Sequence, residues 1–273
     1  MNLPSLNAFL AGIFCLTIFS GPCAFAQDTA RFSKSEADLA FRYPDAFTIN
    51  PASVRVTLIS VDEEPDMDYV KLQERPGDLN SVLVSIEKIV NIAEKIWQIV
   101  DANKPVVNIE SKYATAYPEG ITSASQLSSW SKPKVASYAF YAENLYGAVM
   151  VNAKYKVAFS YNGTYKGKGK YLTGVAVIPT MADVGWGYRF YMSAAVPDST
   201  IANTGTDAAP VAAMQLKLSW KIATALKQSD GTSVYYVQGD GYFEEIASPW
   251  KRNELRVEDL GSAAPLLTPG KVF

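Results

Sequence analysis

Few residues in this chain can carry catalytic or metal chemistry. The sequence contains no histidine, and both of its cysteines, Cys15 and Cys23, lie in an apolar segment at the N-terminus. Histidine and cysteine are the usual ligands of zinc and iron-sulfur clusters, and the usual base and nucleophile of hydrolytic enzymes. Beyond its N-terminal segment the chain therefore excludes zinc centres, histidine-ligated haem, iron-sulfur clusters, and Ser-His-Asp or Cys-His catalysis.

A turn signal at Asn162-Gly163-Thr164 separates two segments in which apolar and polar residues alternate. A two-residue loop at this point would place lysines opposite apolar residues of the preceding strand. A three-residue loop instead pairs Tyr161 with Tyr165 and Tyr155 with Tyr171, which brings the aromatic rings together. The sequence therefore predicts a hairpin that turns at 162–164.

That register would gather five lysines on the opposite face of the hairpin. Lys156 would lie directly across from Lys170, and like charges so placed repel each other. No acidic residue occurs between Asn144 and Ala182. The face is either a solvated surface that opposes aggregation, or a docking surface for an acidic polysaccharide, lipopolysaccharide phosphates or an acidic protein. The candidate ligand-binding lysines are Lys154, Lys156, Lys166, Lys168 and Lys170.

Aromatic residues offer a second kind of contact. Trp130 lies in a polar segment, 128–133, and is the best candidate for an exposed ring that stacks on a ligand such as a sugar. Trp186 and Trp220 fall on the apolar faces of predicted strands. We therefore expect these two tryptophans in the core.

Acidic residues suggest two further sites. Carboxylates surround Pro65 and could hold Ca²⁺, but the segment lacks an Asp-x-Asp-x-Asp-Gly pattern and is equally typical of a solvated turn. Asp240 and Glu244 flank Gly241, and a glycosidase or lyase would need such a pair at a defined separation. The acids of the first group are Asp62, Glu63, Glu64, Asp66 and Asp68.

The N-terminal residues predict export. Residues 9–19 are apolar, and Ala24-Phe25-Ala26 has the small-x-small pattern that signal peptidase recognises. We expect cleavage after Ala26, because the apolar run is too short for a transmembrane helix, which takes about 20 residues. A mature chain without cysteines favours a bacterial location: periplasmic, outer-surface or secreted.

The elements that position these residues are predicted to be mostly strands. Each expected strand has one apolar and one polar face, a pattern typical of an antiparallel β-sandwich, jelly-roll-like or an open barrel. The expected strands cover 53–61, 106–114, 134–142, 149–161, 170–178, 186–196, 214–222 and 233–243.

One long amphipathic helix is predicted over 79–101. Apolar residues recur there in steps of four and three from Val82 to Val100, and Pro105 follows. We expect the helix to pack on the sheet. A membrane-active helix is the alternative, although its polar face carries balanced charge rather than a basic excess.

Composition and order together give an expected organisation. We expect a signal peptide at 1–26 and one β-rich domain at 27–273. The domain would contain a strand-plus-helix segment (27–104), a sheet core (105–248) and an irregular tail (249–273). A hydrophobic content of 48% supports a sizeable core, and 27 acids against 25 bases disfavour nucleic-acid binding.

The sequence therefore predicts an exported, non-enzymatic β-sandwich protein that binds or assembles at the cell envelope, with no transmembrane segment in the mature chain. A carbohydrate-active enzyme using carboxylate or Tyr/Lys chemistry is one alternative. A membrane-acting protein that releases the 79–101 helix is another.

Overall fold

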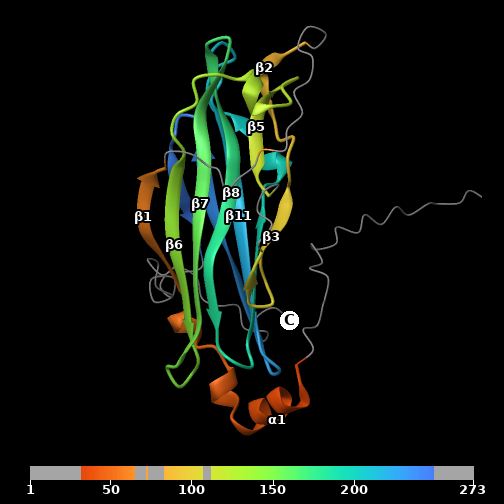
Figure 1. Ribbon diagram of the computed structural model, residues 1–273, viewed down its shortest axis with the longest axis vertical. Coiled ribbons are helices and arrows are strands. Elements are labelled where there is room, and N and C mark those ends of the chain that lie inside the picture. Colours follow the sequence, from red (N-terminus) through yellow and green to blue (C-terminus); the bar gives the residue numbers. More distant parts are fainter. Residues whose placement is uncertain (1–31, 65–71, 73–82, 107–111, 249–273) are drawn as a thin grey trace, which may run out of the picture. The chain divides into compact units, whose positions relative to one another are not determined.

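The computed structural model describes residues 32–64, 72, 83–106 and 112–248. These residues form two antiparallel sheets of six and seven strands (Figure 1), which confirms the predicted mainly-β sandwich. The predicted signal peptide, the C-terminal tail, and Asp66 and Asp68 of the acidic segment lie outside the described residues.

The six-stranded sheet has the order β1-β6-β7-β8-β5-β2. The two longest strands, β7 and β8, contain 17 residues each and form a hairpin at its centre. The strands of this sheet are β1 (Arg55–Glu63), β2 (Ser85–Val90), β5 (Ala114–Glu119), β6 (Lys134–Glu143), β7 (Val149–Tyr165) and β8 (Lys168–Val184).

The seven-stranded sheet has the order β13-β12-β11-β9-β3-β4, and a short strand, β10, pairs with β11 outside this path. Its strands are β3 (Ile96–Asp101), β4 (Lys104–Pro105), β9 (Arg189–Ala195), β10 (Ala202–Asn203), β11 (Ala212–Ala223), β12 (Gln228–Gln238) and β13 (Phe243–Ala247). Most of the strands expected from the alternation of the sequence are therefore present, with shifted ends. The expected strand at 106–114 lies mostly outside the described residues.

Aromatic side chains pack between the two sheets. Phe140 on β6 lies 5.0 Å, between ring centroids, from Phe190 on β9, and 5.1 Å from Trp220 on β11. Such tilted and edge-on contacts add to the stabilisation from burial. Trp220 is 6% exposed, which confirms that it belongs to the core.

A hydrogen-bonded tyrosine pair also lies between the sheets. The hydroxyl oxygens of Tyr155 on β7 and Tyr235 on β12 are 2.7 Å apart, and both side chains are buried. This hydrogen bond gives each buried hydroxyl a partner, which buried polar groups require.

The prediction of a long helix over 79–101 is wrong. The described part of this segment forms strands β2 and β3, joined by a turn in which the Asn91 side chain accepts hydrogen bonds from the amides of Ala93 (3.1 Å) and Thr115 (2.9 Å). The segment is rich in β-branched residues, which favour strands. The pairing of both strands is irregular, with register shifts between Ser85 and Ile89 and between Gln98 and Val100, and these shifts interrupt the two-residue period.

One α-helix is found in the described part of the chain, α1 (Lys34–Arg42), and the sequence reasoning missed it. A Ser-x-x-Glu capping box starts it: the Glu36 amide donates to Ser33 Oγ (3.2 Å), and the Ser33 amide donates to Glu36 Oε2 (2.7 Å). No helix among the described residues is long and apolar enough to cross a bilayer. The 3-10 helices are η1 (Pro44–Phe47), η2 (Pro51–Ser53), η3 (Ala124–Gln126) and η4 (Asp198–Thr200).

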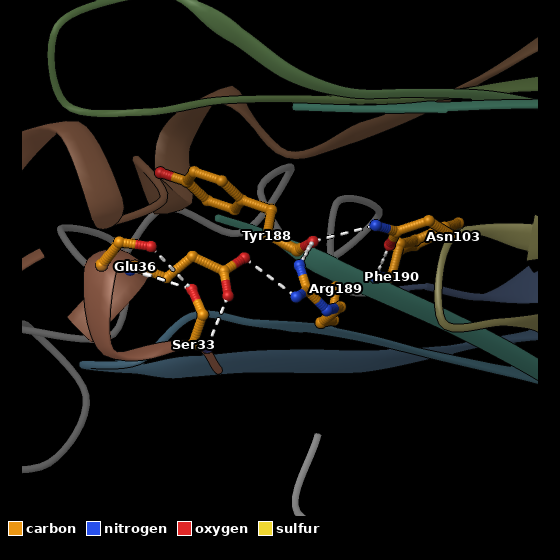
Figure 2. A network of polar contacts seen from close by, with 7 residues as sticks. Ser33, Glu36, Asn103, Tyr188, Arg189 and Phe190 are labelled. Atoms are coloured by element: carbon orange, nitrogen blue, oxygen red, sulfur yellow. Dashed lines mark hydrogen bonds and ion pairs between the residues drawn. The ribbon is translucent and has the colours of Figure 1, made fainter. Parts of the chain in front are cut away.

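Glu36 also attaches α1 to the seven-stranded sheet (Figure 2). Its other carboxylate oxygen lies 2.9 Å from Nη2 of Arg189, the first residue of β9, and the Glu36 residue is only 5% exposed. Arg189 Nη1 and Asn103 Nδ2 both donate to the Tyr188 carbonyl at 2.9 Å. The network therefore joins the helix, the β3–β4 turn and the start of β9.

Candidate functional site

The end of the β7–β8 hairpin is a two-residue turn at Lys166-Gly167. Tyr165 pairs with Lys168 across it, and the two turn residues have φ of 50° and 75°. Positive φ at both central residues is typical of hairpin turns whose twist matches the strands. The three-residue turn predicted at 162–164 is therefore wrong.

Asn162 and Gly163 instead form an irregularity inside β7. Asn162 has φ of 63°, and its side-chain amide donates to Ser131 Oγ at 2.8 Å. The register of the β7–β8 ladder shifts on both sides of Gly163, so the pairing is locally irregular. The signal that suggests a turn thus produces a bulge, because tertiary contacts hold the loop-forming asparagine within a longer strand.

Three lysines gather at the hairpin end, which lies at the opposite end of the sandwich from α1 (Figure 1). Lys166, Lys168 and Lys170 are all exposed, and none forms an ion pair with a described residue. Lys166 Nζ lies 5.2 Å from the ring centroid of Tyr165, an aromatic neighbour that the sequence reasoning did not single out. We call these four residues the hairpin-end cluster.

Glycine and a buried tyrosine give the hairpin-end cluster its support. Gly169 has φ of 79°, and a Cβ atom there would lie 2.5 Å from Tyr171 Cε2. Only glycine lets the ring pack so closely against the backbone. The Tyr171 hydroxyl then donates to the Ile86 carbonyl at 2.8 Å, and the Lys170 amide donates to the Pro210 carbonyl at 2.9 Å. The lysines therefore extend from an anchored backbone.

Lys154 and Lys156 lie further along the sheet, so the predicted pairing of Lys156 with Lys170 is wrong. Lys156 pairs with Ile178, eight residues further along β8 than Lys170, or roughly 26 Å at 3.3 Å per residue. Lys156 Nζ also forms a half-buried ion pair with Glu64 Oε1 at 2.6 Å. Lys154 remains exposed beside Met181 on the next strand. Because the hairpin turns at 166–167 and not at 162–164, Lys154 and Lys156 lie away from the three lysines at the hairpin end.

Trp130 is half-buried rather than a free stacking platform. Its indole nitrogen donates to the Ala124 carbonyl at 3.2 Å, and its ring lies so close to Gly163 that a Cβ there would be 2.3 Å from Trp130 Cη2. The ring therefore covers the bulge in β7. Its polar sequence neighbours concealed this contact, because the glycine partner is 33 residues away in the chain.

Trp186 is the exposed tryptophan, and its predicted core location is wrong. Strand β9 begins only at Arg189, so Trp186 lies in the preceding turn, where Gly187 has φ of 80°. The side chain is 58% exposed and makes an edge-on contact with Phe47, at 6.1 Å between centroids.

The acidic residues are engaged in local contacts. Asp62 and Glu63 belong to β1, and Glu64 pairs with Lys156. Asp240 accepts from the Tyr242 amide at 3.0 Å, and Glu244 accepts from the Tyr242 hydroxyl at 2.6 Å. Among the described residues, no group of three or more acids is arranged to hold a metal ion.

Comparison with known proteins finds no matching family model, no similar curated protein and no similar solved structure.

Proposed function

We propose that this chain is an exported, non-enzymatic binding protein of the bacterial envelope, and that the hairpin-end cluster binds an anionic glycan. The observation that carries the proposal is the concentration of three exposed lysines within five residues, without ion pairs to the described residues. Elsewhere Lys156 is paired with Glu64, whereas the hairpin lysines have no carboxylate partner among the described residues. Their summed field attracts carboxylate, sulfate or phosphate groups.

The arrangement suits a polymer better than a small ligand. The lysines follow one another along a strand end, and Tyr165 adds a ring that can contact a sugar face. Lysine ammonium groups are flexible point charges, which tolerate different spacings of anionic groups. We therefore expect modest affinity at each site and a strong dependence on salt, because exposed charges are screened within about 8 Å at physiological ionic strength.

The test compares two triple variants with equal loss of charge. One carries Lys166→Gln, Lys168→Gln and Lys170→Gln. The control carries Lys104→Gln, Lys217→Gln and Lys227→Gln, which are exposed lysines of other elements. Polygalacturonate, lipopolysaccharide and neutral dextran serve as probes in biolayer interferometry at low and moderate salt.

We expect the hairpin variant to bind the anionic probes about tenfold or more weakly than the unmodified protein, which corresponds to about 1.4 kcal/mol. The control variant should keep its affinity, and neutral dextran should not bind. Preference for polygalacturonate or for lipopolysaccharide would distinguish carboxylate from phosphate as the recognised group. Equal losses in both variants, or no binding of either anionic probe, would overturn the proposal.

A further inference from the structure

Strand β1 is an open edge of the six-stranded sheet. Among the described strands it pairs with β6 alone, and it lies at the side of the sheet in Figure 1. No other described strand lies against its second side. The backbone amides and carbonyls on that side can therefore pair with a further strand.

Three apolar side chains of β1 are exposed. Leu58, Ile59 and Val61 are 49%, 55% and 48% exposed. The register with β6 shifts between Leu58 and Ser60, so Ile59 has no partner on β6. From residue 55 to residue 63, β1 contains neither lysine nor proline; of the devices that protect sheet edges it has the bulge at Ile59 and charged residues at its two ends. The exposed apolar side chains between those charges form a surface that a second strand can cover.

The charges of β1 are ordered so that the strand complements itself. Arg55 begins the strand, and Asp62 and Glu63 end it. None of the three forms an ion pair with a described residue; Arg55 stacks on Tyr141 at 4.0 Å instead. Two antiparallel copies centred on Ile59 would place each Arg55 opposite Glu63 of the other copy. A parallel arrangement would align like charges, which is unfavourable.

We propose that two copies of this chain associate through β1, with the strands antiparallel about a twofold axis at Ile59. Each copy then contributes the same surface, as a twofold interface requires. The two six-stranded sheets become one continuous sheet, and the exposed apolar residues of each β1 are covered by those of the other. This interface does not involve the hairpin-end cluster, so its test is independent of glycan binding.

The first test measures mass by sedimentation equilibrium across a range of protein concentrations. We expect a monomer–dimer equilibrium, and we expect Ile59→Lys to weaken the dimer at least about tenfold, since it places two ammonium groups at the axis. The matched control is Ile246→Lys on β13, which is 42% exposed and also lies on an edge strand. The control should leave the equilibrium unchanged. A protein that is monomeric at every concentration would overturn the proposal.

A charge exchange tests the orientation of the strands. Arg55→Glu alone and Glu63→Arg alone should each weaken the dimer, because each puts like charges opposite each other. The double variant should restore association, because it returns opposite charges to the pair. Failure of the double variant to recover, with circular dichroism showing folded protein, would contradict antiparallel pairing.

A disulfide provides a separate geometric test. In the mature chain, which contains no cysteine, Ile59→Cys should form an intermolecular disulfide under mild oxidation, because the axis brings the two residues face to face. Ile246→Cys should remain reduced under the same conditions. Equal cross-linking at both positions would indicate random collision and would count against the interface.

Discussion

Glu36 ionises more easily than a glutamate in the unfolded chain. Burial alone would raise its pKa, but the hydrogen bonds from Ser33 and the ion pair with Arg189 outweigh burial, so the pKa lies below its ordinary value of about 4.5. The folded protein is therefore stabilised by this carboxylate above about pH 4.5. The stabilisation is lost as the pH falls through the lowered pKa.

Arg189→Met should destabilise the protein by about 2 to 3 kcal/mol at neutral pH, because it leaves the buried Glu36 carboxylate without its charged partner. The difference from the unmodified protein should shrink as the pH falls through the lowered pKa of Glu36, because the protonated carboxyl no longer needs a charged partner. Urea unfolding at several pH values measures both effects. The exposed residue Lys34 provides a control, since Lys34→Met should change stability by less than about 0.5 kcal/mol. A constant difference at all pH values would contradict this account.

The tyrosine pair in the core predicts non-additive substitutions. Tyr155→Phe and Tyr235→Phe should each cost about 1 to 2 kcal/mol, because each leaves a buried hydroxyl without its partner. The double variant removes both hydroxyls and should cost less than the sum of the two. A double-mutant cycle from urea unfolding gives the coupling energy. Additive losses would mean that the two hydroxyls do not depend on each other.

At the scale of elements, the β7–β8 turn predicts a separation of stability from binding. Lys166 holds φ of 50°, which asparagine adopts more readily than lysine. Lys166→Asn should therefore stabilise the protein by about 0.5 kcal/mol, while it weakens binding to polygalacturonate by removing one charge. Thermal unfolding and biolayer interferometry measure the two effects separately. Destabilisation would contradict the assigned turn geometry.

Strands with regular alternation could be predicted from the sequence, and irregular elements could not. β6, β11 and the first part of β7 keep a clear two-residue period, so their existence and their buried faces follow from the pattern. The bulges of β2 and β3 disturb that period and produced a false helix. The short helix α1 has little apolar patterning, although Ser33 and Glu36 carry a capping signal that could have identified it.

The sequence indicates which lysines belong to the candidate site, but it does not indicate how they are arranged. Lys166, Lys168 and Lys170 follow directly from the alternation with glycine, whereas their separation from Lys156 depends on which of two turn signals closes the hairpin. Asn162-Gly163 and Lys166-Gly167 both permit positive φ. The choice between them is made by distant partners, such as Trp130 over Gly163, which local sequence does not reveal.

The whole molecule should have an unusually flat dependence of stability on pH near neutrality. The mature chain expected after cleavage at Ala26 has neither histidine nor cysteine, so apart from the terminal amine no group in it with an ordinary pKa titrates between about pH 5 and 9. Buried tyrosines set the alkaline limit: burial and, secondarily, the charge of Glu87 raise the pKa of Tyr171 to about 12. Because unfolded tyrosines ionise near pH 10, stability is retained below that value and falls above it.

We expect the free energy of unfolding to change by less than about 1 kcal/mol between pH 6 and 9, and to fall above about pH 10 as tyrosines ionise on unfolding. Urea titrations across this range, with phenolate absorbance as a second signal, measure the dependence. A transition between pH 6 and 8 would contradict the prediction and would point to a strongly shifted carboxylate or lysine.

The length and position of the β7–β8 hairpin also determine how the protein would respond to pulling. Each of its strands has 17 residues, about 55 Å at the usual rise. The neighbouring strand β6 pairs with β7 along the length of β6. A force applied to a polymer held at the hairpin end would run along the strands and load the β6–β7 ladder in shear, because β7 would be pulled past β6. Because the hydrogen bonds lie across the strands, many would share the load at once instead of opening one after another. If the hairpin end binds a polymer as proposed, we therefore expect the hairpin to resist a pull along its strands more strongly than a pull across them.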